Sequence, residues 1–234
     1  MKTIKIAHLY PNLMNLYGDY ANIVVLKKHL EDQGLKVRVD YLELNKRIDL
    51  SLYDFIYMGS GTENNLKVVL ADFGKYKKDL SKCIKDNKVI LFTGNAISLL
   101  GNKIDNKKAL GVFDFDTVVS DKRYTGDVVL HNEDIGEVVG FINTSLIIDN
   151  KDKHNLFEYI FKDRNLKTNK TEGYHLNNLF ATSVIGPVLV KNPCFMNVIV
   201  KKLLPLKNKY KEVQYKYEED SYRITLEALL ERNR

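Results

Sequence analysis

A sharp turn between a buried strand and a short helix is the part of this chain best suited to chemistry. The apolar run 89–92 has the character of a buried parallel strand, and it breaks at residues 93–95 before a short helical segment that ends at Gly101. This pattern is typical of a nucleophile elbow, which holds one side chain above a sheet beside helix N–H groups. The chemistry expected there is nucleophilic attack by the apex residue. Here the apex is Gly94, which has no side chain to attack with.

Other nucleophiles lie near the turn or at a helix start. Thr93 and Ser98 flank the apex, and His175 on a downstream segment is the candidate base for either hydroxyl. Cys83 lies on the apolar side of a predicted helix and is interpreted as a small buried residue. Cys194 stands at a predicted helix start, where the helix N-terminus is expected to lower its pKa and make it reactive. The five histidines are dispersed without metal-ligand spacing, so no metal and no cofactor are predicted.

The elements that position the turn alternate between apolar strand-like runs and helical patterns. This alternation predicts βαβ units and a mainly parallel sheet covered on both faces. Ligand sites in such sheets lie at the carboxyl ends of the strands, so the loop 10–19 is expected beside the turn. The predicted strands are Thr3–Leu9, Lys36–Leu42, Phe55–Met58 and 89–92, and the predicted helices are 21–33 and a longer one over 66–86.

The second half of the chain has a different pattern. Shorter alternating strands are predicted over 113–119, 125–130, 137–141 and 178–184. Residues 151–170 are polar and lysine-rich, and they are predicted to form an exposed excursion around an amphipathic piece at 156–161. We expect one domain over residues 1–204. A helix over 193–204 would end it, and a basic tail with a terminal amphipathic helix over 221–232 would form residues 205–234. That last helix either docks on a partner or packs back on its own domain.

Composition excludes several classes of function. The chain has 234 residues, 44% of them hydrophobic and 28% charged, which is ordinary for a globular protein. The net charge of +6 comes from scattered lysines without an arginine cluster or an aromatic stacking platform, so no nucleic-acid partner is expected. Lys2 and Lys5 interrupt the first apolar run too early for a signal peptide, and no run is long enough for a membrane span. Two cysteines give no framework of disulfides, which favours the cytoplasm.

Four blocks of sequence resemble one known family. They read His8-Leu-Tyr-Pro-Asn-Leu-Met-Asn-Leu-Tyr-Gly-Asp19, Tyr57-Met-Gly-Ser-Gly-Thr-Glu-Asn64, the elbow, and Glu172-Gly-Tyr-His-Leu-Asn-Asn-Leu-Phe-Ala-Thr-Ser-Val-Ile-Gly-Pro187. The whole chain resembles a class I glutamine amidotransferase domain of the cobyric acid synthase type. Within that group it is most similar to the glutaminase subunits of bacterial lipid II isoglutaminyl synthases. The resemblance implies an α/β three-layer sandwich with a mainly parallel central sheet and an antiparallel extension.

The chain departs from the family at its two catalytic positions. The family's elbow reads Cys-Gly-Gly-Tyr-Gln-Leu-Leu-Gly, so that Gly94 stands at the catalytic cysteine and Ser98 at the glutamine-contacting Gln. The family's catalytic histidine belongs to Thr-Tyr-Leu-His-Gly-Pro, and its position here is Ile185. Loss of either member of such a pair removes nearly all of the nucleophilic rate advantage.

Backbone features of the family's site are expected to remain. A tetrahedral oxyanion needs N–H donors, and the resemblance places these in the loop of Gly59, Ser60 and Gly61 and at Asn95. Arg123 matches the family's substrate-contacting arginine, although a surface arginine in a turn is an equally good interpretation.

Three functions remain open at this stage. The first is a catalytically degenerate subunit, a pseudoenzyme that forms a heterodimer with a Mur-ligase-type amidating partner in peptidoglycan precursor (lipid II) amidation or a related reaction. In the intact family that ATP-dependent partner activates the D-glutamate carboxylate of lipid II, and the glutaminase supplies ammonia. The second is a working glutaminase subunit that uses an unrecognised nucleophile. The third is a stand-alone protein that binds glutamine or another small metabolite in the old glutamine pocket.

Overall fold

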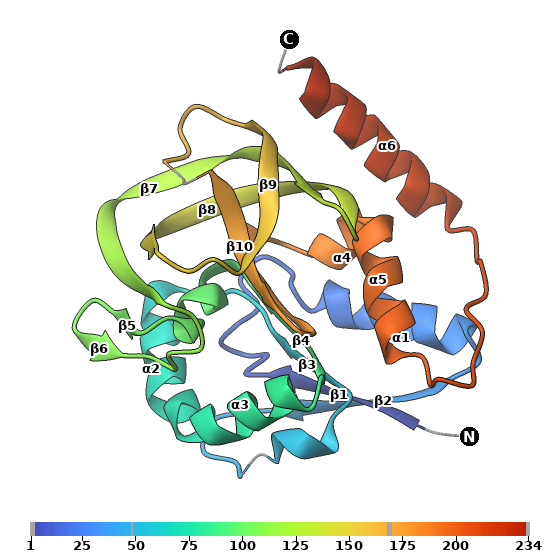
Figure 1. Ribbon diagram of the computed structural model, residues 1–234, viewed down its shortest axis with the longest axis horizontal. Coiled ribbons are helices and arrows are strands. Elements are labelled where there is room, and N and C mark those ends of the chain that lie inside the picture. Colours follow the sequence, from blue (N-terminus) through green and yellow to red (C-terminus); the bar gives the residue numbers. More distant parts are fainter. Residues whose placement is uncertain (1–2, 48, 168–169, 233–234) are drawn as a thin grey trace.

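The apolar runs of the first half form the parallel part of one large sheet. The computed structural model describes residues 3–47, 49–167 and 170–232 (Figure 1). The predicted strands appear as β1 (Thr3–Leu9), β2 (Lys36–Leu42), β3 (Phe55–Met58) and β4 (Val89–Thr93). In the described residues the sheet has 12 strands. The others are β5 (Lys103–Ile104), β6 (Lys107–Lys108), β7 (Phe115–Asn132), β8 (Gly136–Asn150), β9 (Asn155–Lys162), β10 (Thr171–Leu176), β11 (Leu179–Thr182) and β12 (Val184–Ile185). Their order is β12-β8-β7-β9-β10-β11-β4-β3-β1-β2, with β5 paired to β7 and β6 paired to β5.

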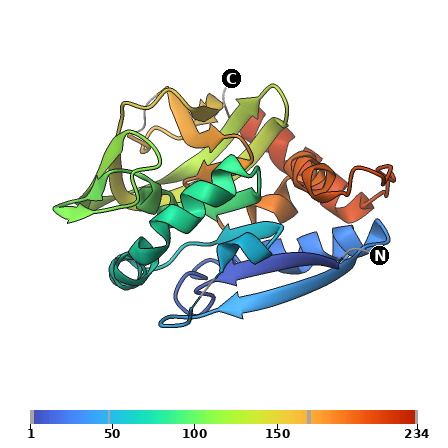
Figure 2. The same cartoon turned by 60° about the horizontal axis from the view of Figure 1, so that its bottom comes forward.

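Alternating side chains of the central strands build a core on each face of the sheet. Ile56 and Phe92 point into one core, and Phe55 and Leu91 point into the other. The first core is covered by α2 (Glu63–Phe73) and α3 (Lys77–Lys85), and the second by α1 (Ala21–Asp32) and α5 (Pro193–Leu203). Figure 2 shows the sheet between these helical layers. The fold is therefore the expected three-layer α/β sandwich.

The prediction of a single helix over 66–86 is wrong in one respect, because the structure divides this segment into two helices. A 3-10 turn, η2 (Gly74–Tyr76), separates α2 from α3, and α2 begins earlier, where the Thr62 hydroxyl accepts from the Asn65 N–H at 3.1 Å. The apolar spacing continues across the break because Phe73 and Tyr76 both face the same core. Gly74 has a low helix propensity, and it marks the point of division.

The antiparallel extension is larger than the sequence indicated. In place of the short strands predicted over 113–141, the structure has two long antiparallel strands, β7 (Phe115–Asn132) and β8 (Gly136–Asn150). The register of this pair shifts between Val119 and Tyr124. The gap left between the predicted strands falls at that irregularity. The excursion predicted around 156–161 contains a sheet strand, β9 (Asn155–Lys162), so the prediction of an exposed segment is wrong there. The segment predicted as one strand over 178–184 is divided into β11 (Leu179–Thr182) and β12 (Val184–Ile185), after β10 (Thr171–Leu176).

The C-terminal helix packs on its own sheet. After α4 (Val188–Lys191) and α5, the helix α6 (Lys216–Glu231) lies across β7 and β8, with Leu229 buried against Val129 and Val139. Arg232 pairs with two carboxylates of the same sheet region, Asp127 at 2.6 Å and Asp163 at 2.7 Å. These contacts favour the second of the two roles considered for this helix.

Candidate functional site

The elbow between β4 and η3 (Gly94–Leu100) lies where the sequence predicted it. Gly94 has φ +60°, a left-handed conformation that residues with a Cβ rarely adopt. A Cβ built there would lie 2.5 Å from both the Cβ and the Oγ of Ser60, and 3.2 Å from Cγ2 of Ile185. The two positions assigned by resemblance to a catalytic pair are therefore neighbours in space. A cysteine at 94 would require room that Ser60 now fills.

The loop of Gly59, Ser60 and Gly61 is held against the segment that follows β1. A Cβ at Gly59 would lie 2.6 Å from the Met14 carbonyl oxygen, and one at Gly61 would lie 2.6 Å from the Leu13 carbonyl oxygen. Both glycines are required by this close approach of backbone to backbone. The two segments named in the first two family blocks therefore form a single packed unit at the carboxyl ends of β1 and β3.

The backbone donors expected to stabilise an oxyanion already have partners within the chain. The Ser60 N–H donates to Asp19 Oδ2 at 2.9 Å, and the Gly61 N–H donates to Asn95 Oδ1 at 2.9 Å. The Asn95 N–H donates to Ser60 Oγ at 3.3 Å. The Asn95 side chain also donates to the Gly61 carbonyl oxygen at 2.6 Å, so that it clamps both polar groups of that residue. An oxyanion would have to displace these bonds before it could use the donors.

The hydroxyls beside the apex are also engaged. Ser98 Oγ donates to the Asn95 carbonyl oxygen at 2.7 Å, and Thr93 Oγ1 lies 3.0 Å from the Tyr57 hydroxyl. His175 Nε2 lies 2.7 Å from the Asn177 carbonyl oxygen, and its ring stacks on Phe180 at a centroid distance of 4.5 Å. The structure therefore brings Ser98 and Thr93 to the elbow but holds His175 in other contacts.

Neither thiol has the character of an active nucleophile. Burial raises the pKa of Cys83 and of Cys194 above the ordinary thiol value. The Cys194 thiol donates to the Glu137 carbonyl oxygen at 3.2 Å. The expectation of a lowered pKa at Cys194 is therefore wrong, because burial outweighs the helix N-terminus.

Arg123 lies in a small pocket at the mouth of the elbow. This pocket has a volume of about 230 Å³, and Ser60, Gly61, Asn95 and Arg123 all line it. Arg123 Nη2 lies 2.7 Å from Glu63 Oε1, and its Nη1 donates to Asn143 Oδ1 at 3.0 Å. Arg123 therefore lies at the mouth of the elbow, and the Glu63 carboxylate neutralises it there.

The sequence did not point to Glu63 and Asn143 as the partners of this arginine. Glu63 also accepts from Ser145 Oγ at 2.7 Å. Glu63 belongs to the second of the four sequence blocks, residues 57–64. That block alone did not indicate that Arg123 would pair with the Glu63 carboxylate. Asn143 and Ser145 lie on β8, and only the folding of the long β7–β8 pair over the elbow brings them there.

A buried polar layer supports the elbow from below. The Tyr57 hydroxyl accepts from Asn22 Nδ2 at 2.8 Å as well as meeting Thr93, and the Asn22 side chain accepts from the Leu189 N–H at 2.8 Å. Asp19 is fully buried next to this layer, and burial raises its pKa to about 6. These contacts join β3, β4, α1 and α4 beneath the turn.

The described residues also bear on two other classes of site. In residues 3–47, 49–167 and 170–232, no group of three or more His, Cys, Asp or Glu side chains is arranged to hold a metal ion. None of the helices in this part of the chain is both long and apolar enough to cross a membrane.

The fold and the elbow define a glutamine amidotransferase-type domain, and comparison with known proteins agrees. The chain belongs to the CobB/CobQ-like glutamine amidotransferase domain family, whose model matches residues 5–193. It is 33% identical over 200 residues to the lipid II isoglutaminyl synthase (glutamine-hydrolyzing) subunit GatD of Streptococcus pneumoniae (strain ATCC BAA-255 / R6), covering 81% of this chain and 76% of that protein. It is 28% identical over 210 residues to the subunit of the same name from Staphylococcus aureus (strain N315), covering 86% and 85%.

Solved structures support the fold alone. The glutaminase domain of Trypanosoma brucei CTPS with bound acivicin superposes with a TM-score of 0.55 at 10% identity, covering 90% of this chain and 97% of that one. A structure described as a glutamine amidotransferase has the same TM-score at 13% identity, covering 84% and 98%.

We predict that Gly94→Ala destabilises the chain by about 3 kcal/mol, because the left-handed backbone and the contact with Ser60 both oppose a Cβ. Gly18→Ala is the matched control, since Gly18 has φ +73° but nothing within 4 Å of its Cβ position. It should cost only about 1 kcal/mol. Chemical unfolding measures both. In a Ser60→Gly background the cost of Gly94→Ala should fall to that of the control, and an unchanged cost would show that Ser60 is not the obstacle.

We also predict a pH dependence from Asp19. Since its folded pKa of about 6 exceeds the unfolded value, the folded chain keeps a proton that the unfolded chain releases between about pH 4 and 6. Raising the pH through this window should therefore lower the free energy of unfolding by roughly 2–3 kcal/mol, and Asp19→Asn should lack that decline.

The comparison with the variant is necessary because burial lowers the pKa of His8 to about 4, which acts in the opposite direction over a similar range. The measurement is denaturant unfolding of both proteins at several pH values. A difference between them that is constant from acid to neutral pH would contradict the role given to Asp19.

Proposed function

We propose that this chain is a glutaminase-like subunit that does not hydrolyse glutamine and that acts by binding a Mur-ligase-type amidating protein. The reaction served is lipid II amidation or a related step of peptidoglycan synthesis. Support comes from membership of the CobB/CobQ-like family and from two relatives that are named as lipid II isoglutaminyl synthase subunits. The two unpaired thiols agree with a cytoplasmic location.

One observation carries the proposed loss of hydrolysis. Gly94 and Ile185 meet at the elbow, so the place of a nucleophile and its base holds no sulfur and no imidazole. Ser60 and Asn95 additionally occupy the N–H donors that would stabilise the tetrahedral intermediate. A site with neither nucleophile nor free oxyanion donors lacks both of the parts that acyl transfer requires.

A working glutaminase subunit is the second candidate. It is favoured by the names of the two relatives, both of which are described as glutamine-hydrolyzing. In this chain the nucleophile would have to be Ser98 or Thr93, and each of these hydroxyls is bonded to a neighbour.

We predict that the purified chain releases no glutamate from glutamine above the buffer rate, either alone or with its partner. The physical reason is the absence of a thiolate and a base at Gly94 and Ile185. The measurement is glutamate formation, with the Streptococcus pneumoniae relative as the positive control. Turnover stimulated by the partner, and abolished by Ser98→Ala or by Thr93→Val, would establish the second candidate instead.

A partner-binding surface is expected at the mouth of the elbow, where an active glutaminase would release ammonia to its partner protein. Leu16 lines the pocket that contains Arg123 and is 50% exposed. An exposed apolar side chain at this rim suits a protein contact. Leu52 is 56% exposed but precedes β3, so it lies at the opposite ends of the parallel strands.

We predict that Leu16→Asp lowers the amount of co-purified Mur-ligase-type protein by about fivefold or more, because a charge replaces an apolar contact. Leu52→Asp should leave it unchanged. The measurement is quantitative mass spectrometry after affinity purification from the native cell, with melting temperatures of all three proteins compared. Equal capture by Leu16→Asp and the unmodified chain would exclude this surface.

A further inference from the structure

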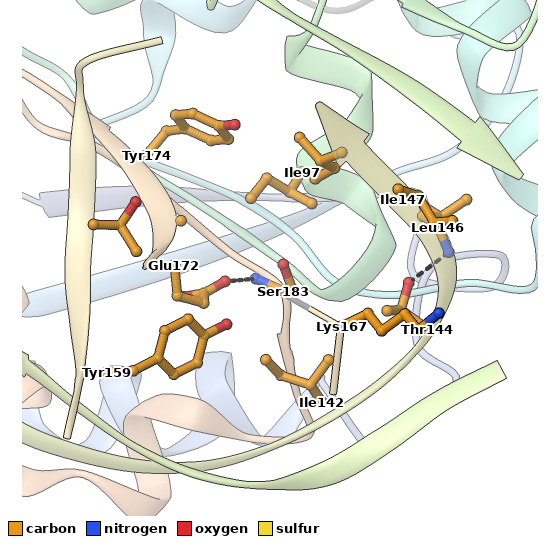
Figure 3. A pocket seen from close by; sticks show the side chains of 13 residues that line it. Ile97, Ile142, Thr144, Leu146, Ile147, Tyr159, Lys167, Glu172, Tyr174 and Ser183 are labelled. Atoms are coloured by element: carbon orange, nitrogen blue, oxygen red, sulfur yellow. Dashed lines mark hydrogen bonds between the residues drawn. The ribbon is translucent and has the colours of Figure 1, made fainter. Parts of the chain in front are cut away.

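A second cavity lies beside the pocket that contains Arg123. It has a volume of about 460 Å³ and lies between η3, β8, β9 and β10 (Figure 3). It shares Thr144 and Leu146 with the Arg123 pocket but contains none of the elbow residues Ser60, Gly94 and Asn95. Its size falls within the range of small-molecule sites. The proposed function does not use it.

The cavity has one apolar wall and one polar wall. Ile97 of η3 and Ile142, Leu146 and Ile148 of β8 supply the apolar side. The opposite side is polar and includes the carboxylate of Glu172, which is only 3% exposed. A cavity with this division suits a ligand that has an aliphatic part and a polar part.

Glu172 is a buried carboxylate whose partners in the chain are neutral. Its Oε2 accepts from Thr182 Oγ1 at 2.7 Å, and its Oε1 accepts from the Ser183 N–H at 2.6 Å (Figure 3). The Ser183 hydroxyl also bonds this carboxylate. Since an ionised carboxylate has about four acceptor positions, one position remains for a further donor. A buried charge is costly when no opposite charge compensates it, and a ligand ammonium would supply that charge.

The floor of the cavity is open because residue 183 is small. Ser183 lines the cavity, and it stands where the family motif Thr-Tyr-Leu-His-Gly-Pro has tyrosine. A tyrosine side chain in the same direction would occupy space beside Glu172. The opening is therefore a feature of this chain's own sequence.

A cation lies at the rim of the same cavity. Lys167 is exposed, lines the cavity and lies close to Thr144 in Figure 3. Within residues 3–47, 49–167 and 170–232, no carboxylate forms an ion pair with it. A cavity with a buried negative group, a positive group at its rim and an aliphatic wall matches a zwitterion with an apolar side chain.

We propose that this cavity binds a free amino acid with an aliphatic side chain. The ammonium group of the ligand donates to Glu172, its carboxylate meets Lys167, and its side chain packs against Ile97, Ile142 and Leu146. The two charged contacts lie at different depths, so an analogue that lacks either charge loses one of them.

Methyl NMR on the full chain tests this directly, because isoleucines line the apolar wall. The probes are L- and D-leucine and L- and D-valine, added up to about 10 mM, which suffices for a Kd near 1 mM. At least one should cause saturable shifts of the δ1 methyls of Ile97, Ile142 and Ile148. Ile23 and Ile199, in the core on the other face, should not move. No saturable shift at the three lining methyls with any probe would overturn the proposal.

Two analogues, two variants of the cavity and one control variant separate the contacts. 3-Methylbutylamine lacks the carboxylate and 4-methylpentanoate lacks the ammonium, and each should bind about tenfold more weakly than leucine. Lys167→Met should weaken leucine binding about tenfold, whereas Lys207→Met, at an exposed lysine elsewhere, should not change it. Ser183→Tyr should abolish binding while the chain stays folded.

Equal binding of leucine and 3-methylbutylamine, or no effect of Lys167→Met, would overturn the assignment of a zwitterion. If Ser183→Tyr fails to fold, Lys167→Met and the analogues decide the question without it. Glutamate release plays no part in these measurements, so the proposal stands or fails separately from the proposed function.

Discussion

The contact of Ser60 with Gly94 is the constraint on which the rest of the elbow depends. Because the Ser60 side chain occupies the space above the apex, the turn accepts a residue without a Cβ and excludes any other at its present geometry. The same hydroxyl accepts from the Asn95 N–H, and the Asn95 side chain then closes on Gly61. Three residues thus satisfy one another's polar groups in a place where an active enzyme leaves such groups free for the transition state.

The layer beneath the elbow has a different physical role. Asp19, Asn22, Tyr57 and Thr93 are buried polar groups whose bonds join the loop after β1 and the elements α1, β3, β4 and α4. Buried hydrogen-bonded networks fix one arrangement because any displaced member would be left without a partner. The frame of the elbow is therefore kept rigid even though the residue at its apex carries no reactive atom.

Two pockets share the residues Thr144 and Leu146 of β8, and their electrostatics differ. In the pocket at the elbow mouth, Glu63 neutralises Arg123, so a ligand there must compete with an internal ion pair. In the larger cavity, Glu172 is bonded only to neutral groups, so a cationic ligand gains a partner without breaking one. Both pockets take part of their lining from β8, which is paired along its length with β7.

The sequence by itself determined the three-layer sheet, the elbow and the family. Local signals sufficed for these, because apolar runs such as Phe55–Met58 and the break after residue 92 are set by neighbouring residues. Tertiary structure decided what the elbow contains. The contact of Ser60 with Gly94, the pairing of Glu63 with Arg123 and the floor formed by Ser183 and Glu172 join segments far apart in the chain. The distances between these residues are set by the packing of the whole sheet, which no local sequence pattern encodes. Burial likewise raised the pKa of Cys194 where its place at a helix start indicated the reverse.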